Sequence, residues 1–393
     1  MNAIKTLLKI YLICAGISVH LFAFGIFLIA PDRVRDVYYR GSAWMEIRVP
    51  SFQGSSAAAE SQYSIEEEIA LNFGSWQPLA NLSESGEIDG IWVNDKKVGS
   101  LKEASRILEN GDLVQIGAGT YQQALIVRAD DVTVVGIGHV VIEKASAEGK
   151  AAIITKGNNI HIKNIECRYI EVRDKNGACV RHEGQDLTLT HVYFHHSQQG
   201  LLAGGNSGII LIEESRFERL GLNGRAHGIY VNGGTLILKD SLVVASKSQG
   251  HEVKSRAAET IIENSVIASL SATDSRLIDI PNGGVLKIEK SILQMGVNSS
   301  NQDLIGYGLE KRAHTINRVE LTDNLIVMER NGNNALFHKH NRLPDMVAQN
   351  NLIVAAKPPE LEGFNLLFTS RSEAGLEAYP KLPKIDQLVS SVK

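Results

Sequence analysis

The sequence is poor in several residue types, and each shortage removes a class of protein. Its 393 residues include three cysteines and nine prolines, and aromatic residues make up only 6%. Three cysteines without a CxxC pair exclude a disulfide framework and a zinc finger. The low proline content excludes a proline-rich extended chain. Acidic residues (44) slightly outnumber basic ones (40), which excludes a nucleic-acid-binding protein held by bulk positive charge.

What the chain does contain favours an elongated, aliphatic protein. Hydrophobic residues make up 44% of it, and 35 glycines suit many tight turns. The length exceeds that of one ordinary compact domain unless the architecture is extended. Cys14 lies in an apolar segment and Cys167 at an expected core position, so we expect the cysteines to be buried, small apolar residues.

The amino-terminal region predicts membrane attachment. Residues 10–30 are almost entirely apolar, which matches the roughly 20 residues needed to cross a bilayer. Pro31 follows Ala30 and makes a poor cleavage site, which favours an uncleaved signal anchor over a cleaved signal peptide. Basic residues flank the segment on both sides, so charge does not fix its orientation. We expect an anchor with its flanks at 1–40 and a linker or stalk at 41–88, with one short helix near 64–71.

A repeat dominates the rest of the chain. Short stretches with alternating aliphatic residues recur about every 27 residues, and period two indicates strands. The repeat has neither the leucine-rich pattern nor the length of a propeller blade, about 40 residues. A parallel β-helix of about nine coils over residues 89–355 explains it. Its anchor positions are Ile137, Ile165, Val192, Ser215, Ser241, Ser265, Ser291, Asn324 and Asn351.

The polar anchors and the flanking segments predict further details. The serine and asparagine anchors should form one inward column that exchanges hydrogen bonds between coils. Ser100 followed by Glu103 is a capping-box signature, so residues 100–108 should form a short helix that caps the solenoid. Residues 111–116 should open the first strand and residues 117–121 should turn it. Residues 356–393 should form the other cap or a tail.

Alternation within the second strand of each coil predicts a functional row. If Ile229 and Val253 point inward, Tyr230 and Lys254 stack outward, and Asp279 joins them one coil later. By the same spacing, Asn232 stacks on Arg256, and Arg181 reaches the first row two coils earlier. We expect Lys254, Tyr230, Arg256 and Asp279 to be catalytic. The expected substrate-binding residues are Arg181, His227, Asn232, His251, Asn282 and Tyr307.

The two histidines allow several interpretations. His227 and His251 share one column at 24-residue spacing, and they could be ligands, a general base or a stacked pair. No carboxylate recurs at the spacing of the histidines, so the sequence gives little support for a metal site there. No cofactor is expected, with calcium held by scattered carboxylates left open as an alternative.

Four short motifs carry a resemblance to a known group. Residues 227–230 read HGIY, residues 250–257 GHEVKSRA, residues 279–284 DIPNGG and residues 304–308 LIGYG. They resemble a bacterial, membrane-anchored, exopolysaccharide-associated group of right-handed parallel β-helix proteins in the pectate-lyase-like superfamily. Residues 99–121 are similar to its entry segment. The superfamily contains polysaccharide lyases, hydrolases and uronate epimerases, so the resemblance implies a polysaccharide substrate. The paired aspartates typical of pectate lyases and polygalacturonases are not evident.

These observations favour a lyase that cleaves an acidic, uronate-containing exopolysaccharide by β-elimination. Arg256 or Arg181 would hold the uronate carboxylate, Lys254 beside neighbouring cations or Tyr230 would be the base, and Asp279 would orient Lys254. A C5-epimerase would use the same groups. A glycoside hydrolase would need two carboxylates, for which Asp279 and Glu252 are the obvious pair. A non-catalytic binding protein of an export system is the third alternative. The expected location is the bacterial inner membrane with the β-helix in the periplasm, or secretion after cleavage, with exopolysaccharide machinery as a partner.

Overall fold

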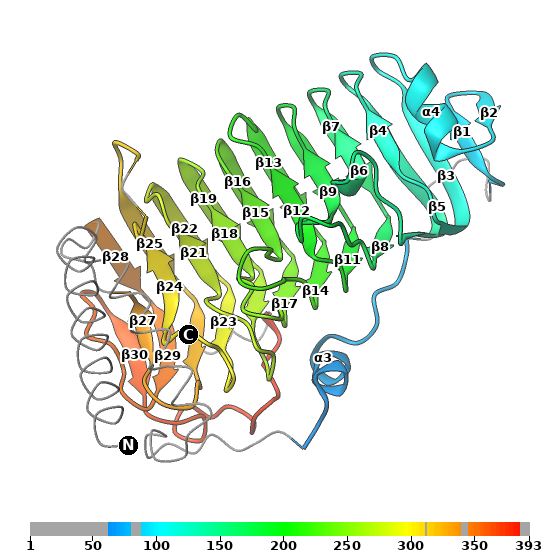
Figure 1. Ribbon diagram of the computed structural model, residues 1–393. Coiled ribbons are helices and arrows are strands. Elements are labelled where there is room, and N and C mark those ends of the chain that lie inside the picture. Colours follow the sequence, from blue (N-terminus) through cyan, green and yellow to red (C-terminus); the bar gives the residue numbers. More distant parts are fainter. Residues whose placement is uncertain (1–61, 80–87, 311–312, 339–344, 386–393) are drawn as a thin grey trace, which may run out of the picture.

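The computed structural model describes residues 62–79, 88–310, 313–338 and 345–385. Within them the chain winds into an elongated parallel β-solenoid of about nine turns (Figure 1). The parallel β-solenoid architecture expected from the repeat is therefore confirmed. Its right-handed sense stays a prediction, favoured by the strong preference of parallel crossovers for that hand.

The strands form two sheets, one of nine strands and one of 21. The nine-stranded sheet consists of β4 (Leu125–Val127), β6 (Ala151–Thr155), β9 (Ala178–His182), β12 (Gln199–Ala203), β15 (Ile229–Val231), β18 (Val253–Ser255), β21 (Ile278–Ile280), β24 (Asp303–Tyr307) and β27 (Ala335–Phe337).

The larger sheet contains two rows of strands separated by a bend, and each row supplies one face of the solenoid. Its first row consists of β3 (Leu113–Tyr121), β5 (Thr133–Glu143), β7 (Ile160–Lys163), β10 (Leu187–Thr190), β13 (Ile209–Glu213), β16 (Thr235–Lys239), β19 (Glu259–Glu263), β22 (Val285–Glu289), β25 (Arg318–Thr322) and β28 (Asp345–Gln349). Its second row consists of β8 (Glu166–Arg168), β11 (Tyr193–His195), β14 (Arg216–Glu218), β17 (Leu242–Val244), β20 (Val266–Ala268), β23 (Ile292–Met295), β26 (Leu325–Met328), β29 (Asn351–Ala355) and β30 (Asn365–Phe368). The long strand β5 pairs with both β7 and β8.

Alternating side chains build the core inside the coil. In β16, Leu236 and Leu238 are fully buried, whereas the residues between and beside them are partly exposed. The same inward positions on neighbouring rungs pack into one continuous aliphatic cluster that runs along the solenoid. Burial of this surface supplies the main favourable free energy of folding.

The predicted polar column exists and lies at the bend of the larger sheet. The backbone N–H of Ser215 donates to the Ser241 hydroxyl at 3.0 Å, and the N–H of Ser241 donates to Ser265 at 3.1 Å. The ladder continues through Ser291 to Asn324. Each serine hydroxyl also donates to the carbonyl two residues earlier in its own rung, so the buried polar groups are satisfied.

The amino-terminal end of the solenoid is capped largely as expected. Helix α4 (Leu101–Ile107) begins after Ser100, whose hydroxyl accepts the Glu103 N–H at 3.0 Å. An antiparallel hairpin of β1 (Ile91–Val93) and β2 (Lys96–Val98), not foreseen from the sequence, pairs through β1 with β3. The turn expected at residues 117–121 is wrong, because β3 continues to Tyr121 and absorbs the glycines in a register shift between Gly117 and Gly119.

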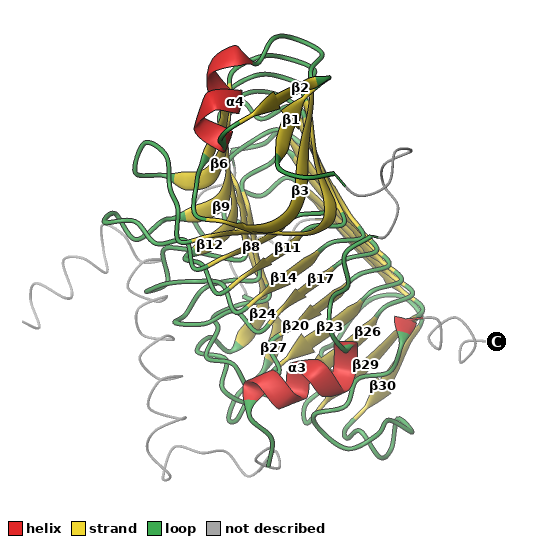
Figure 2. Ribbon diagram, turned by 90° about the vertical axis from the view of Figure 1, so that its right-hand side faces the viewer, coloured by secondary structure: helices red, strands yellow, loops and turns green. Residues whose placement is uncertain are grey.

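Helix α3 (Ile65–Phe73) lies on the outside of the larger sheet (Figure 2). Its residues Ile65, Ile69 and Phe73 pack with apolar residues that the second row of strands turns outward. The tail after β30 packs on the same cluster. The Asn72 side chain joins the two segments, donating to Pro380 O at 3.1 Å and accepting the Leu382 N–H at 2.7 Å. The short helix expected near 64–71 is confirmed, but it is docked on the solenoid.

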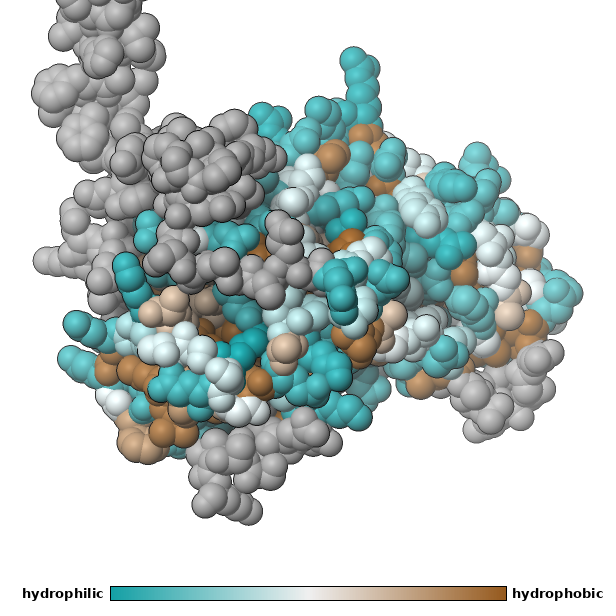
Figure 3. Space-filling view, turned by 90° about the horizontal axis from the view of Figure 1, so that it is seen from below, coloured by the Kyte–Doolittle hydropathy of each residue, from teal (hydrophilic) through white to brown (hydrophobic). Residues whose placement is uncertain are grey.

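Two further expectations concern the ends of the chain, a membrane anchor at one and a cap or tail at the other. The apolar segment at 10–30 lies outside the described residues, and no described helix is long and apolar enough to cross a membrane. β30 adds one more rung after residue 355. Near it, Phe364 is 68% exposed and Leu367 44% exposed. Seen from below, hydrophilic residues predominate on the described surface, and apolar patches are scattered along it (Figure 3).

Candidate functional site

The predicted row exists on the outer face of the nine-stranded sheet. Tyr230 in β15 is in register with Lys254 in β18, and Lys254 is in register with Asp279 in β21. The flanking residues Ile229 and Val253 are fully buried inside the coil. Because rungs stack in register at about 4.8 Å, residues 24 and 25 positions apart become lateral neighbours. The alignment on which the site was predicted is therefore confirmed.

Lys254 lies between two carboxylates. Its Nζ is 3.2 Å from Asp279 Oδ2 and 3.5 Å from Glu310 Oε1. Only 13% of the lysine side chain is exposed, compared with 48% of the Glu310 side chain. The nearest charged groups of Lys254 are therefore anions, in contrast to the cationic surroundings expected from the sequence.

Arg256 holds the same glutamate with its guanidinium fork. Its Nη2 lies 2.7 Å from Glu310 Oε1 and 2.8 Å from Oε2, and its Nη1 donates to Asn232 Oδ1 at 3.2 Å. The contact with Asn232 confirms that these two residues stack on neighbouring rungs. Glu310 was missed by sequence reasoning, because it follows β24 in a connecting segment and is 54 residues from Arg256.

The two carboxyl groups at the site have lowered pKa values. Burial by itself raises the pKa of Asp279, but the positive charges of Lys254 and Arg276 outweigh that effect and lower it. Burial also acts to raise the pKa of Glu310, and the hydrogen bonds from Arg256 together with the charge of Lys254 outweigh it. Both groups are therefore carboxylates at neutral pH.

Tyr230 is enclosed by rings and cations. The Arg256 guanidinium carbon lies 5.2 Å from the Tyr230 ring centroid, and Lys254 Nζ lies 5.8 Å from it. The His227 ring meets the same ring edge-on, with 5.3 Å between centroids. A half-buried phenol beside two cations suits either proton transfer or contact with a sugar ring.

His227 and His251 form a stacked pair inside the corner before these strands. Their rings are 4.8 Å apart at 16°, and both residues are buried. The backbone N–H of His251 donates to His227 Nδ1 at 3.1 Å, and the N–H of Arg276 donates to His251 Nδ1 at 3.1 Å. Burial, followed by the neighbouring His251, lowers the pKa of His227 well below its usual value. His251 Nε2 then faces Asp279 Oδ2 at 3.6 Å.

Two predicted substrate-binding residues, Arg181 and Tyr307, lie apart from this cluster, whereas Asn282 follows Pro281, whose carbonyl accepts the Glu310 N–H. Arg181 occupies the same row, but Leu202 separates it from Tyr230, and its Nε is 3.4 Å from Glu183. Asn282 follows β21 and is half-buried. Tyr307 is 4% exposed and packs inside the coil, where its hydroxyl bonds to Gly284 and Asn317.

Glu252 points away from the row and into a separate buried group. Its carboxylate accepts the Ser246 N–H at 3.0 Å, and none of the residue is exposed. Burial, followed by the neighbouring Asp274, raises the pKa of Glu252 well above its usual value. Asp279 and Glu252 therefore do not form a pair that a substrate could reach.

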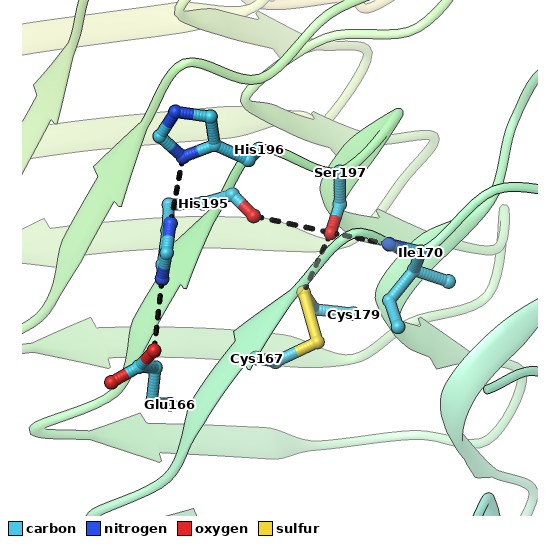
Figure 4. Close-up of a disulfide and its surroundings, with 7 residues drawn as sticks. All are labelled: Glu166, Cys167, Ile170, Cys179, His195, His196 and Ser197. Atoms are coloured by element: carbon cyan, nitrogen blue, oxygen red, sulfur yellow. Dashed lines mark hydrogen bonds and ion pairs between the residues drawn. A yellow bond between two sulfur atoms is a disulfide. The ribbon is translucent and has the colours of Figure 1, made fainter. Parts of the chain in front are cut away.

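The described part of the chain contains one disulfide and no cluster of metal-ligating side chains. Within the described ranges, no group of three or more His, Cys, Asp or Glu residues is placed to hold a metal ion. Cys167 and Cys179 form a disulfide, which corrects the expectation of unpaired cysteines (Figure 4). Ser197 lies beside it, with its hydroxyl 3.5 Å from Cys179 Sγ. The disulfide joins β8 to β9 and so ties together the two ends of the segment that connects these strands.

A second polar cluster lies next to the disulfide, on the outside of the larger sheet (Figure 4). Glu166 contacts His139 at 2.7 Å and His195 at 3.1 Å, and His195 Nδ1 lies 2.7 Å from His196 Nδ1. Burial acts to raise the pKa of Glu166, but the hydrogen bonds from the two histidines outweigh it and lower the pKa to about 2. Trp76 stands over His139, so the segment after α3 covers part of this cluster.

Comparisons with known proteins identify distant structural neighbours. No protein-family model matches the sequence, and no curated protein matches it either. Among solved structures, an alginate lyase from Paenibacillus sp. strain FPU-7 aligns with 69% of this chain and 95% of its own, at 14% identity and a TM-score of 0.41. A mutant of a family PL6 alginate lyase aligns with 69% of this chain and 52% of its own, at 9% identity and a TM-score of 0.34. Both likenesses are distant.

Proposed function

We propose that the face around Lys254 and Arg256 binds an acidic polysaccharide and cleaves it by β-elimination. One observation carries this proposal: the two cations already hold a surface carboxylate, that of Glu310, at 2.7 Å from Arg256 and 3.5 Å from Lys254. A uronate carboxylate has the same charge and the same planar pair of oxygens. The arginine fork is suited to recognising such a group in two-point contact.

The residues of the site divide the reaction between them. β-Elimination removes the proton from C5 of the uronate, forms the C4–C5 double bond and expels the C4 oxygen, which then takes up a proton. Arg256 and Lys254 would neutralise the carboxylate as negative charge develops on it. Tyr230 is assigned the proton transfer, because Lys254 is flanked by two carboxylates and acts as a hydrogen-bond donor. As the phenolate, Tyr230 would take the C5 proton and then give it to the expelled C4 oxygen. Asp279 would position the Lys254 ammonium, and His251 would steady Asp279.

The carboxyl pKa values support a lyase over a glycoside hydrolase. A hydrolase of the usual kind needs one carboxylic acid with a raised pKa as proton donor. Asp279 and Glu310, the two carboxyl groups next to Lys254, both have lowered pKa values. Glu252 has a raised pKa but lies buried behind the sheet. A C5-epimerase fits the same geometry, because both reactions begin by removing the C5 proton; the epimerase then returns a proton to the opposite face of C5 and leaves the C4–O bond intact.

The proposed substrate and the disulfide both support a periplasmic location. We propose that the solenoid lies in the bacterial periplasm, anchored to the inner membrane through residues 10–30 and acting with exopolysaccharide machinery. A disulfide between Cys167 and Cys179 is typical of an oxidising compartment and rare in the cytosol.

The reaction class can be tested with the full chain and defined polymers. Alginate, polygalacturonate and a glucuronate polymer are incubated with the protein, and products are followed by ultraviolet absorbance and reducing-end analysis. Unsaturated, absorbing products support the lyase. New reducing ends without that absorbance would show a hydrolase, exchange of the C5 hydrogen with deuterated water without scission an epimerase, and binding without turnover a scaffold.

Variants at Arg256 test whether this face is responsible. Arg256→Lys keeps the charge but loses the fork, so kcat/KM should fall about tenfold or more. Arg318→Lys is the matched control, because Arg318 pairs with Glu320 at 2.6 Å on the other sheet. Equal activity of both variants would move the site away from Arg256.

A further inference from the structure

Glu310 has the position and geometry of a substrate group. Its two oxygens lie 2.7 and 2.8 Å from Arg256 Nη2, and one of them is 3.5 Å from Lys254 Nζ. Arg256 also donates to Asn232, so the two cations have a defined anion-binding arrangement of which Glu310 is the present occupant. Any ligand carboxylate that uses both cations must take this position.

The backbone of Glu310 is fixed while its side chain is half exposed. The Glu310 N–H donates to Pro281 O at 3.0 Å, and the preceding Gly308 N–H donates to Ile280 O at 2.8 Å. Nearly half of the side chain, 48%, is exposed to solvent. A change of side-chain rotamer is therefore enough to move the carboxylate out, and the strand end need not shift.

We propose that Glu310 is a built-in competitor that occupies the position of the uronate carboxylate until an acidic sugar displaces it. This inference rests on the proposed function and deepens it. A uronate replaces one carboxylate with another, so Arg256 and Lys254 keep a counter-ion. A neutral sugar that displaced Glu310 would leave the guanidinium without one, and a site with an unpaired charge rejects such a ligand. The two cations therefore select acidic units, and Glu310 lowers the apparent affinity of any ligand that must displace it.

The test compares Glu310→Gln with the full-length wild type. Binding is measured by calorimetry with oligogalacturonate, oligomannuronate and oligoglucuronate as acidic probes and a galactan oligomer as the neutral probe. A half-exposed ion pair of this kind accounts for at most about a fivefold change in affinity. The uronate that binds the wild type should therefore bind Glu310→Gln about three- to fivefold more tightly. Galactan, which has no carboxylate to place on the two cations, should bind both proteins equally weakly.

Two further readouts separate this role from a structural one. Glu310→Gln should lower KM and leave kcat unchanged. The Glu310 carboxylate is already displaced once substrate is bound, so it does not affect the step from bound substrate to transition state. Glu320→Gln removes the same charge from a surface pair on the other sheet and should leave affinity and KM unchanged. Thermal unfolding checks that both variants are folded.

The outcomes distinguish this inference from the proposed function. If Arg256→Gln abolishes uronate binding while Glu310→Gln binds as weakly as the wild type or more weakly, Glu310 is no competitor and the proposed function stands. If neither the wild type nor Glu310→Gln binds any uronate probe, the acidic-substrate proposal fails, and this inference fails with it.

Discussion

Asp279 Oδ2 lies 3.2 Å from Lys254 Nζ on the neighbouring rung, although only 3% of Asp279 is exposed. An outward row on a solenoid wall usually holds solvated ion pairs that contribute little to stability. Here the carboxylate is buried, and the lysine is its closest cation. A change in either residue should therefore affect both the proposed reaction and the stability of the fold.

Removing Lys254 should affect both activity and folding. Lys254→Ala should abolish turnover and also reduce the free energy of unfolding by about 1–3 kcal/mol, because a buried carboxylate loses a partner. Arg276 and His251 remain within 3.8 Å and limit the loss. Urea unfolding of Lys254→Ala, Asp279→Asn and the double variant measures the coupling. Strictly additive effects would show that the pair is not coupled.

The buried Asp274 should give the protein an unusual pH response. Burial is the main cause that raises the pKa of Asp274 to about 7, whereas the unfolded value is about 4. The folded state therefore binds a proton more tightly, so this contribution is complete below about pH 4 and is lost as the pH rises through about 7. Wild type should lose stability relative to Asp274→Asn over that window.

The comparison with the variant is needed because histidines act in the opposite direction. Burial lowers the pKa of His182 to about 4, which makes the fold more stable as the pH rises toward 6.5. Both proteins share that effect, so the difference between their unfolding midpoints reports Asp274 together with Glu252, whose pKa Asp274 raises. A difference that does not change between pH 4 and 8 would contradict the assignment.

The serine ladder should be costly to interrupt. Ser241→Ala removes the acceptor of the buried Ser215 N–H, and leaving such a group unsatisfied costs about 1–3 kcal/mol. Thr315→Ala removes a hydroxyl from an exposed position and serves as the control. Urea unfolding should separate the two variants, and an equal midpoint would mean that water replaces the lost hydroxyl.

The disulfide should stabilise the first half of the solenoid. Cys167 and Cys179 are 12 residues apart, and a loop of that size contributes about 3 kcal/mol in the chain-entropy model. Cys167→Ser with Cys179→Ser should therefore lower the thermal midpoint. In denatured, non-reduced protein, thiol labelling should modify Cys14 alone. Labelling of all three cysteines would disprove the bond.

The sequence by itself determined the strands, the coil and the central row of the candidate site. Alternation places Ile229 and Val253 inside, and two successive rungs of 24 and 25 residues bring Tyr230, Lys254 and Asp279 side by side. Only the tertiary structure decided that the Glu310 carboxylate pairs with Arg256 and Lys254. The same holds for the position of Tyr307 inside the coil and for the disulfide between Cys167 and Cys179. In-register stacking converts a regular spacing into contact, so periodic residues can be placed from the sequence. Connecting segments differ in length from rung to rung and obey no such rule, and their contacts depend on how each one folds back on the wall.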